Sequence, residues 1–257
     1  MSVPTVITHR DADMLAKAVA ARVIVRAVDA QSAKGSAHLV LTGGTVGIAT
    51  LAEIAASPAR DAVDWRKVDI WWGDERFLPS GDAERNETGA RKALLDHLDL
   101  DPERVHVMRG PDSGMTAEES AEAYAEELRR AARPEDHGPA PSFDLMMLGM
   151  GPDGHIASLF PGLPALYDTR PVVAVHGSPK PPPIRVSLTL PVIQASREVW
   201  VIAAGEEKAG AVRLALSDSG TMQVPAAGAR GSRRTLFLLD RAAASKIPSS
   251  LSRISSP

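Results

Sequence analysis

Four short polar segments of this chain carry the residue types that could act on a small anionic substrate. Each follows an apolar run that predicts a buried strand. In a parallel α/β sheet, the segments that follow the strands meet at the carboxyl edge, where ligands bind. We therefore expect one shared site, formed by TGGT at 42–45, GDER at 73–76, GMGPDGHIAS at 149–158 and GEEK at 205–208.

The segment at 149–158 contains His155, two residues after Asp153. A carboxylate beside an imidazole can fix its tautomer and stabilise the imidazolium, so the pattern favours His155 as a general base acting on water. Either Asp153 or Asp74 could hold the ring. A Ser–His–Asp triad through Ser158 is disfavoured, because the chain has no G-x-S-x-G elbow. The structural alternative is a histidine without a chemical role.

The first segment places Thr42, Gly43, Gly44 and Thr45 between a predicted strand and a predicted helix. Backbone N–H groups at a helix N-terminus can bind an anion, and a phosphate would suit them. A plain turn that needs positive φ fits the motif about equally well. The segment has neither the G-x-G-x-x-G fingerprint of dinucleotide sites nor the terminal lysine of a nucleotide phosphate loop.

Further charged residues lie near the ends of predicted strands. Asp74 could orient a base or accept from a sugar hydroxyl, and Arg76 could bind a phosphate or an oxyanion. Lys208 could bind a phosphate, and Arg185 stands at the mouth of the apolar strand in PPIRVSLTLP. The alternatives are solvated loop charges, a surface lysine, and an edge residue that blocks further strand pairing.

Composition limits the class of protein. The chain has 257 residues, 44% of them apolar, which is enough for a large core. Its formal net charge of −3 gives no reason to expect a nucleic-acid partner. It has no cysteine, and its histidines lack metal-binding spacing, so we expect no metal site. No signal-peptide pattern or membrane-length apolar stretch is present, so a cytoplasmic protein is expected.

Helical and strand patterns alternate along the chain, which predicts an α/β fold with a largely parallel sheet and helices on both faces. We expect a single domain over 1–248 and a frayed tail over 249–257, although the proline-rich stretch at 178–183 could be a linker. The predicted strands lie within 37–44, 67–79, 104–108, 143–149, 181–191, 197–205 and 234–240. The predicted helices are 11–31, 45–57, 85–98, 116–132, 206–217 and 240–247.

Two of these helices carry capping signals. Asn86 is the expected N-cap of the helix over 85–98. Thr116 and Glu119 have the spacing of a capping box, which predicts the start of the helix over 116–132.

Taken together, the segments resemble the 6-phosphogluconolactonase family. LTGGT, WWGDERFLP, NETGARKALLDHL, FDLMMLGMGPDGHIASLFPG, PPIRVSLTLPVIQASREVWVIAAGEEKAG and VPAA occur in the family's order between about 39 and 240. The resemblance implies a Rossmann-like fold shared with sugar-phosphate isomerases and glucosamine-6-phosphate deaminases. It also implies hydrolysis of 6-phospho-D-glucono-1,5-lactone in the pentose phosphate pathway, without a metal or organic cofactor.

The resemblance also implies roles for particular residues. His155 matches the family's general base, and Asp74 with Arg76 matches its polar site loop. Gly43 and Gly44 match the phosphate loop; Lys208 and Arg185 match basic residues that contact phosphate or sugar. The chain departs from the family where Thr42 replaces a frequent serine, and where GARGSRRT follows VPAA in place of an apolar continuation.

Two other functions remain open at this point. A glucosamine-6-phosphate deaminase would use the same scaffold, but the residue after the acidic pair in GDERF favours the lactonase. A non-catalytic phosphosugar sensor would need a DNA-binding segment and a basic face. The expected partner is therefore a small phosphosugar lactone, with no nucleic acid or membrane, and the expected state is a monomer or weak homo-oligomer.

Overall fold

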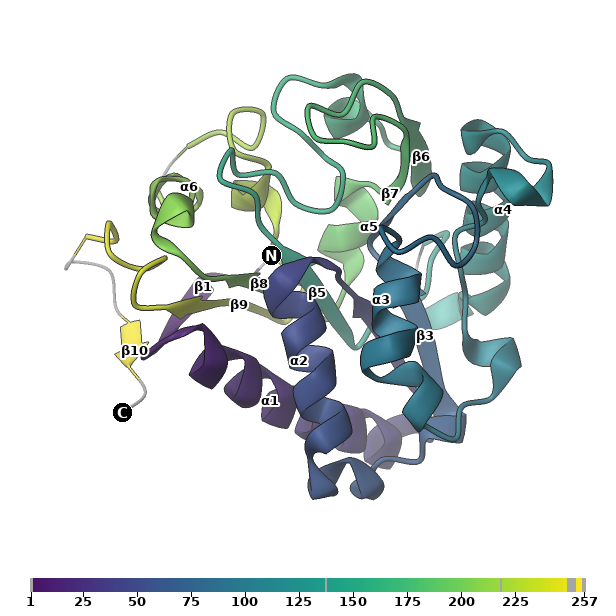
Figure 1. Ribbon diagram of the computed structural model, residues 1–257, viewed down its shortest axis with the longest axis horizontal. Coiled ribbons are helices and arrows are strands. Elements are labelled where there is room, and N and C mark those ends of the chain that lie inside the picture. Colours follow the sequence, from purple (N-terminus) through teal and green to yellow (C-terminus); the bar gives the residue numbers. More distant parts are fainter. Residues whose placement is uncertain (1, 137, 218, 249–252, 256–257) are drawn as a thin grey trace.

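A seven-stranded sheet forms the centre of the computed structural model, which describes residues 2–136, 138–217, 219–248 and 253–255. The strand order is β10-β1-β9-β8-β5-β2-β3, and every neighbouring pair is parallel (Figure 1). The strands are β1 (Pro4–His9), β2 (Ala37–Leu41), β3 (Val68–Trp72), β5 (Leu145–Gly149), β8 (Glu198–Ala203), β9 (Arg234–Asp240) and β10 (Arg253–Ser255). The predicted parallel sheet is confirmed.

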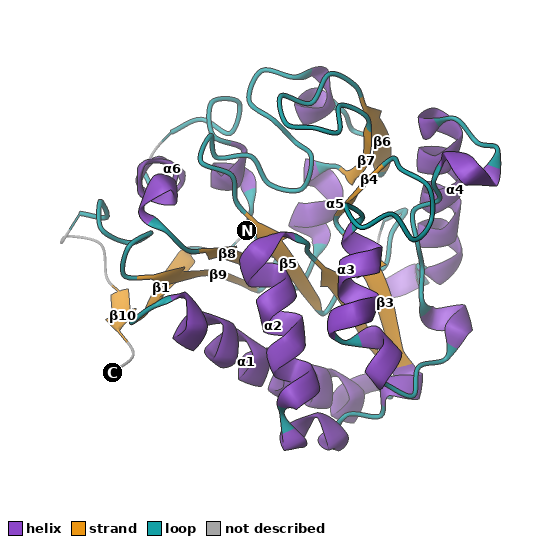
Figure 2. Ribbon diagram, in the orientation of Figure 1, coloured by secondary structure: helices purple, strands orange, loops and turns teal. Residues whose placement is uncertain are grey.

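Helices cover both faces of this sheet (Figure 2). α1 (Ala12–Lys34), α2 (Gly44–Ala56) and α3 (Asn86–Ala93) pack on one face, and α4 (Ala117–Ala131), α5 (Leu190–Ala195) and α6 (Ala209–Ala215) pack on the other. Successive strand residues enter opposite cores, as Trp71 and Trp72 do. A strand that is buried on both sides reads as a continuous apolar run, which is why β2, β3, β5, β8 and β9 were predictable.

A second, smaller sheet lies over the α4 side of the first. It consists of β4 (Asp74–Arg76), β7 (Arg185–Leu188) and β6 (Val172–Val175), paired antiparallel in the order β4-β7-β6. The strand predicted within 181–191 is β7, whose partners the sequence did not identify. The pairing places Arg185 opposite Arg76 in the register.

Two smaller predictions need correction, and one strand was missed. The expected strand over 104–108 forms only an isolated bridge between Val105 and Ile70, and residues 241–246 form turns where a helix was expected. The strand β1 was not predicted; it lies in the sheet between β10 and β9.

The start of α4 follows its sequence signal closely. The Thr116 side chain accepts from the Glu119 N–H at 3.2 Å, and the Glu119 carboxylate accepts from the Thr116 N–H at 2.8 Å. These reciprocal bonds satisfy two N–H groups that a helix N-terminus otherwise leaves free. The predicted capping box is confirmed.

The tail predicted to be frayed, 249–257, is described only at 253–255. These residues form β10 and pair in parallel with β1, with Val6 opposite Arg253. The rest of that prediction falls outside the described residues. Among the described helices, none combines the length and apolar character that crossing a membrane requires.

The amino edge of the sheet, opposite the loops that follow the strands, holds a cluster of charged side chains. His106 stacks on Trp71 with ring centroids 3.7 Å apart. Its Nε2 lies 3.2 Å from the Asp69 carboxylate and its Nδ1 lies 3.5 Å from Glu127. Burial lowers the pKa of His106, but these two carboxylates raise it by more, so the pKa lies above its ordinary value.

We expect His106 to stabilise the fold in its charged form. Because its pKa is raised on folding, its contribution is full below pH 6.5 and is lost as the pH rises through the folded value. His106→Gln should lower the unfolding free energy by about 1–2 kcal/mol at low pH and by less at high pH. Urea unfolding of both proteins between about pH 5.5 and 8.5 measures this. A difference that stays constant with pH would contradict the assignment.

Candidate active site

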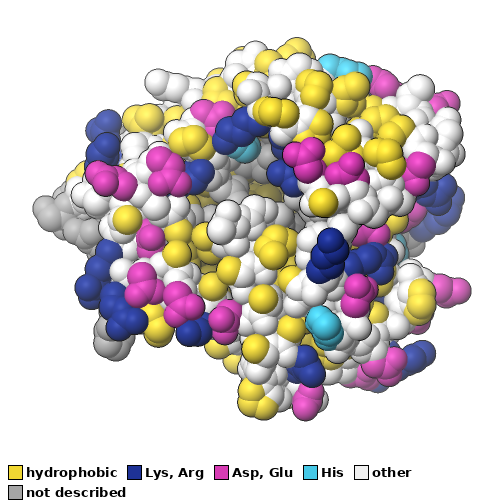
Figure 3. All heavy atoms as spheres, in the orientation of Figure 1, with side chains coloured by type: hydrophobic (Ala, Val, Ile, Leu, Met, Phe, Trp, Pro, Cys, Tyr) yellow, Lys and Arg dark blue, Asp and Glu magenta, His cyan; other side chains and the backbone are white. Residues whose placement is uncertain are grey.

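The four polar segments line one cleft of about 230 Å³ at the carboxyl edge of the central sheet. They follow β2, β3, β5 and β8, which are neighbours in the order β8-β5-β2-β3. Figure 3 shows a hollow on this face, with a histidine and Lys or Arg side chains at its rim. The site residues expected from the sequence that line the cleft are Thr42, Gly43, Gly44, Asp74, Arg76, His155, Arg185 and Lys208.

The two remaining expected site residues lie beside this cleft. Thr45 lines two adjoining cavities, one of them shared with Lys208. Asp153 lies next to His155 and contacts its ring. The structure therefore brings all the expected residues to one region, with Thr45 and Asp153 outside the lining of the cleft itself.

Asp153, rather than Asp74, holds the imidazole of His155. Nδ1 of His155 lies 2.5 Å from Oδ1 of Asp153. Burial raises the pKa of Asp153, but the hydrogen bond and charge of His155 outweigh it and lower the pKa to about 2. A carboxylate can only accept, so Nδ1 carries the proton and Nε2 is the ring atom left to accept one.

The ring of His155 also packs against an aromatic side chain. Its centroid lies 4.4 Å from that of buried Phe160, and the guanidinium carbon of Arg185 lies 5.7 Å from the centroid of the Phe160 ring. Gly151 lets the imidazole lie against the backbone, because a Cβ there would come within 2.1 Å of the His155 ring. Gly151 thus makes room for the histidine.

Asp74 has different partners from those expected. Its Oδ2 accepts from the Ser158 hydroxyl at 2.7 Å and lies 4.0 Å from the Arg185 guanidinium. Ser158 follows Ala157, whose φ of 48° is unusual for a residue other than glycine. Ser158 therefore orients Asp74 and is bonded away from His155, which agrees with the rejection of a Ser–His–Asp triad.

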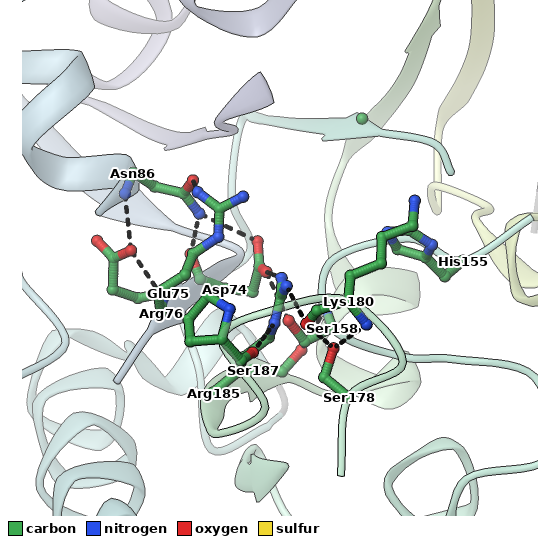
Figure 4. Close-up of polar contacts among 12 residues, drawn as sticks. Asp74, Glu75, Arg76, Asn86, His155, Ser158, Ser178, Lys180, Arg185 and Ser187 are labelled. Atoms are coloured by element: carbon green, nitrogen blue, oxygen red, sulfur yellow. Dashed lines mark hydrogen bonds and ion pairs between the residues drawn. The ribbon is translucent and has the colours of Figure 1, made fainter. Parts of the chain in front are cut away.

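Asn86 is a site residue that the sequence analysis missed. Its Nδ2 donates to the Asp74 carbonyl at 2.8 Å, and its Oδ1 accepts from Nη1 of Arg76 at 2.7 Å (Figure 4). It was expected to be the N-cap of α3, but Arg85 occupies that position and Asn86 is the first helical residue. The role of Asn86 depends on how α3 packs beside the GDER segment, and the local sequence does not show this tertiary contact.

The proline-rich stretch at 178–183 folds over the cleft as a turn. Arg185 donates to the carbonyls of Lys180, Pro181 and Pro182 at 3.0, 3.1 and 3.2 Å. Burial lowers the pKa of Arg185, and the charge of Asp74 opposes that effect. Because the turn is bonded to β7 and lines the cleft, a linker between domains is the wrong interpretation of this stretch.

Lys180, carried by this turn, is the second residue that the sequence analysis missed. It lines the cleft together with Lys208. Burial lowers the pKa of Lys208 and the positive charge of Lys180 lowers it further, while Glu207 and Asp153 act in the opposite direction. Two lysine charges that repel one another are relieved when an anion lies between them.

The N-terminus of α2 adjoins this lysine pair. Gly43 is the N-cap without a side-chain cap, and Gly44, with φ of 77°, begins the helix. A cavity of about 190 Å³ is lined by residues 43–47 and by Lys208. Unbonded N–H groups, the helix dipole and an ammonium group together favour a phosphate there. Among residues 2–136, 138–217, 219–248 and 253–255, no three His, Asp or Glu side chains are grouped to hold a metal ion.

A parallel α/β sheet with an imidazole–carboxylate pair and an anion site at its carboxyl edge is typical of enzymes that act on small phosphorylated ligands. Residues 10–238 match the sequence model of the glucosamine-6-phosphate isomerases/6-phosphogluconolactonase family, and the chain belongs to this family.

Relatives and solved structures agree with this assignment. The chain is 59% identical over 251 residues to the 6-phosphogluconolactonase of Streptomyces coelicolor, covering 96% of each chain. It is 49% identical over 242 residues to that of Mycobacterium tuberculosis, covering 93% of this chain and 96% of the relative. The structure of 6-phosphogluconolactonase from Trypanosoma cruzi is similar with a TM-score of 0.83 and 25% identity, over 95% of this chain and 97% of the other.

Proposed function

We propose that this chain hydrolyses 6-phospho-D-glucono-1,5-lactone to 6-phosphogluconate in the pentose phosphate pathway. The identity to the 6-phosphogluconolactonases of Streptomyces coelicolor and Mycobacterium tuberculosis supports this substrate. The observation that carries the proposal is one cleft lined by His155, whose ring Asp153 holds, and by the lysines Lys180 and Lys208. The imidazole suits acyl chemistry, and the ammonium groups suit a phosphate.

In the first step, His155 activates water. Nε2 of His155 takes a proton from a water as its oxygen bonds to the lactone carbonyl carbon, C1. The C=O π electrons move to the carbonyl oxygen and give a tetrahedral oxyanion. The ionised Asp153 stabilises the imidazolium that results, and this kind of positioned general base contributes about 10²–10⁴-fold.

In the second step, the ring opens. The oxyanion re-forms the C=O bond, the bond between C1 and the ring oxygen breaks, and the imidazolium returns its proton to that oxygen as it becomes a hydroxyl. The product carboxylic acid then releases a proton to solvent. Arg76, held by Asn86, is the proposed donor to the oxyanion, a contribution of ~3–4 kcal/mol at comparable sites.

The phosphate, remote from C1, anchors the sugar. Lys180, Lys208 and the N–H groups at Gly43 and Gly44 bind it, while Arg185 supports the turn that carries Lys180. Binding energy at the phosphate then orients C1 against His155. We further propose a cytoplasmic monomer or weak homo-oligomer that needs no cofactor.

A coupled assay tests the proposed function. Glucose-6-phosphate dehydrogenase generates the lactone in place, and its disappearance is followed above the spontaneous background. The protein should accelerate hydrolysis at catalytic amounts. Ammonia released from glucosamine 6-phosphate, with no lactone hydrolysis, would instead support a deaminase and overturn the proposal.

One glycine of the cleft and one outside it provide a matched test of the cleft geometry. A Cβ on Gly43 would lie 1.9 Å from Oδ1 of Asn86, whereas the Cβ position of Gly35, which ends α1 away from the cleft, is open space. Gly43→Ala should therefore lower kcat/KM by tenfold or more, because the residue that holds Arg76 must move. Gly35→Ala should mainly lower the unfolding free energy, by about 1 kcal/mol, because its φ is positive. Equal kcat/KM in the two variants would contradict this geometry.

A further inference from the structure

The carboxylate of Glu75 lies behind the wall of the cleft, where it does not reach substrate. Its side chain is buried, and it lines none of the cavities at the carboxyl edge. Oε1 accepts from the backbone N–H of Arg76 at 2.8 Å and of Asn86 at 2.7 Å. Oε2 accepts from the N–H of Glu87 at 2.9 Å. One carboxylate thus joins β4 to the first turn of α3.

These hydrogen bonds take the place of a side-chain cap at the start of α3. The N-cap residue, Arg85, makes no side-chain capping bond. The first N–H groups of the helix are instead satisfied by a side chain from another element, and a negative charge there also favours the helix dipole. Consequently the start of α3, and with it the Cα of Asn86, is fixed relative to Arg76.

Asn86 transmits this placement into the cleft. Its amide bridges the Asp74 carbonyl and the Arg76 guanidinium, at 2.8 and 2.7 Å (Figure 4). The backbone of both Arg76 and Asn86 is bonded to the same oxygen of Glu75. The guanidinium is therefore held through its own backbone and through Asn86, both of which depend on Glu75, while Nη1 also donates to the Glu84 carbonyl at 2.8 Å.

A buried acid is a costly way to cap a helix, because serine or aspartate does so at the surface. Burial raises the pKa of Glu75 to about 7, against the lowering by Arg85 and the three backbone N–H groups. Arg85 is itself buried, lies 3.8 Å from Oε2 of Glu75 and donates to the carbonyls of Leu78 and Met108. Such a cost is typical of groups that position a functional site.

We propose that Glu75 is a positioning residue that sets the spacing of Arg76 and Asn86 and so aims the Arg76 guanidinium at the oxyanion of the lactone. The inference rests on the proposed function, because it assigns Arg76 to that oxyanion. It predicts that loss of the Glu75 carboxylate lowers the rate of the chemical step and leaves the phosphate anchor intact.

Glu75→Gln tests this directly. The amide has the same shape, but its NH₂ faces a backbone N–H at one end, so at least one contact is lost. We expect kcat to fall by about 10- to 100-fold with KM within about threefold of wild type. Glu87→Gln is the matched control, because Glu87 also pairs with Arg85, at 3.0 Å, but its carboxylate does not contact the backbone of Arg76 or Asn86. The kcat of this variant should stay within about twofold of wild type.

A double-mutant cycle separates positioning from general stability. In Arg76→Ala the guanidinium is gone, so adding Glu75→Gln should lower kcat by less than about threefold further. If the effects of the two substitutions on kcat multiply instead, Glu75 does not act through Arg76 and the inference is overturned. Thermal melting checks that each variant is folded. Should Glu75→Gln fail to fold, Glu75→Asp keeps the charge with a shorter reach, and its kcat should still fall while its affinity for 6-phosphogluconate is retained.

The possible failures are distinguishable. A wild-type kcat in a folded Glu75→Gln or Glu75→Asp protein overturns this inference and leaves the proposed function standing. If the wild-type protein itself does not hydrolyse the lactone, the proposed function is overturned, and the inference with it.

Discussion

Replacing His155 with alanine is expected to lower kcat by about 10²–10⁴-fold while KM stays within about threefold. The imidazole supplies the only proposed path for the proton from water to the ring oxygen, whereas the proposed phosphate anchor uses other groups, the lysines and the N-terminus of α2. Steady-state kinetics with the lactone generated in place, corrected for spontaneous hydrolysis, measures the change.

Two further variants make this result specific. Asp153→Asn keeps the size of the side chain but loses the charge that stabilises the imidazolium, so its kcat should fall by about tenfold or more. His176→Ala removes an exposed histidine that pairs with Glu118 outside the cleft, and it should leave kcat unchanged. Near-full turnover by His155→Ala would remove His155 from the mechanism.

Replacing Lys208 with alanine is expected to raise KM by about 10- to 100-fold with little change in kcat. Lys208 is half-buried beside the N-terminus of α2, where an ion pair with a phosphate is only partly screened by water. Lys180→Ala should act in the same direction, because Lys180 lines the same cleft. Lys92, an exposed lysine in the last turn of α3, provides the matched control and should leave KM unchanged.

The non-phosphorylated substrate shows whether these lysines recognise the phosphate. Wild-type protein should prefer the phosphorylated lactone over glucono-1,5-lactone, and Lys208→Ala should reduce that preference by the same factor by which it raises KM. An equal loss of kcat/KM on both lactones would mean that Lys208 acts on the sugar or on the fold, and would contradict the phosphate assignment.

The sequence predicted the site best where local rules apply. The segments containing Gly43, Asp74 and His155 each follow a buried strand, and parallel strands bring such segments to one edge. The pairing of His155 with Asp153 spans two residues, so it was among the alternatives visible in the sequence. What the sequence left open was the choice between Asp153 and Asp74, which depends on where β4 lies.

Lys180 and Asn86 were missed because tertiary contacts place them. Lys180 lies at the cleft in a turn that Arg185 and Ser178 hold through hydrogen bonds to its backbone. Asn86 resembles a helix cap in sequence, but the carboxylate of Glu75, from strand β4, binds the first backbone N–H groups of α3 instead. Neither arrangement follows from hydrophobic periodicity or from capping preferences.

The elements that were predicted wrongly have similar causes. The run at 104–108 is apolar enough for a strand, but its pairing with β3 is limited to one isolated bridge, between Val105 and Ile70. Residues 241–246 are rich in alanine, and Asp240 binds the backbone N–H of Ala243 at 2.7 Å, which favours a local turn. The strand β7 was recognised as a strand, but its partner was not, since sequence patterns do not identify the neighbouring strand.

The central claim is that one cleft binds the phosphosugar with its acyl carbon at His155 and its phosphate at the lysines. A crystal structure of the protein with 6-phosphogluconate tests it most directly. We predict the C1 carboxylate within hydrogen-bond distance of Nε2 of His155 and of Arg76, and the phosphate between Lys180, Lys208 and the N-terminus of α2. A phosphate beside His155, with C1 at the lysines, would contradict the account.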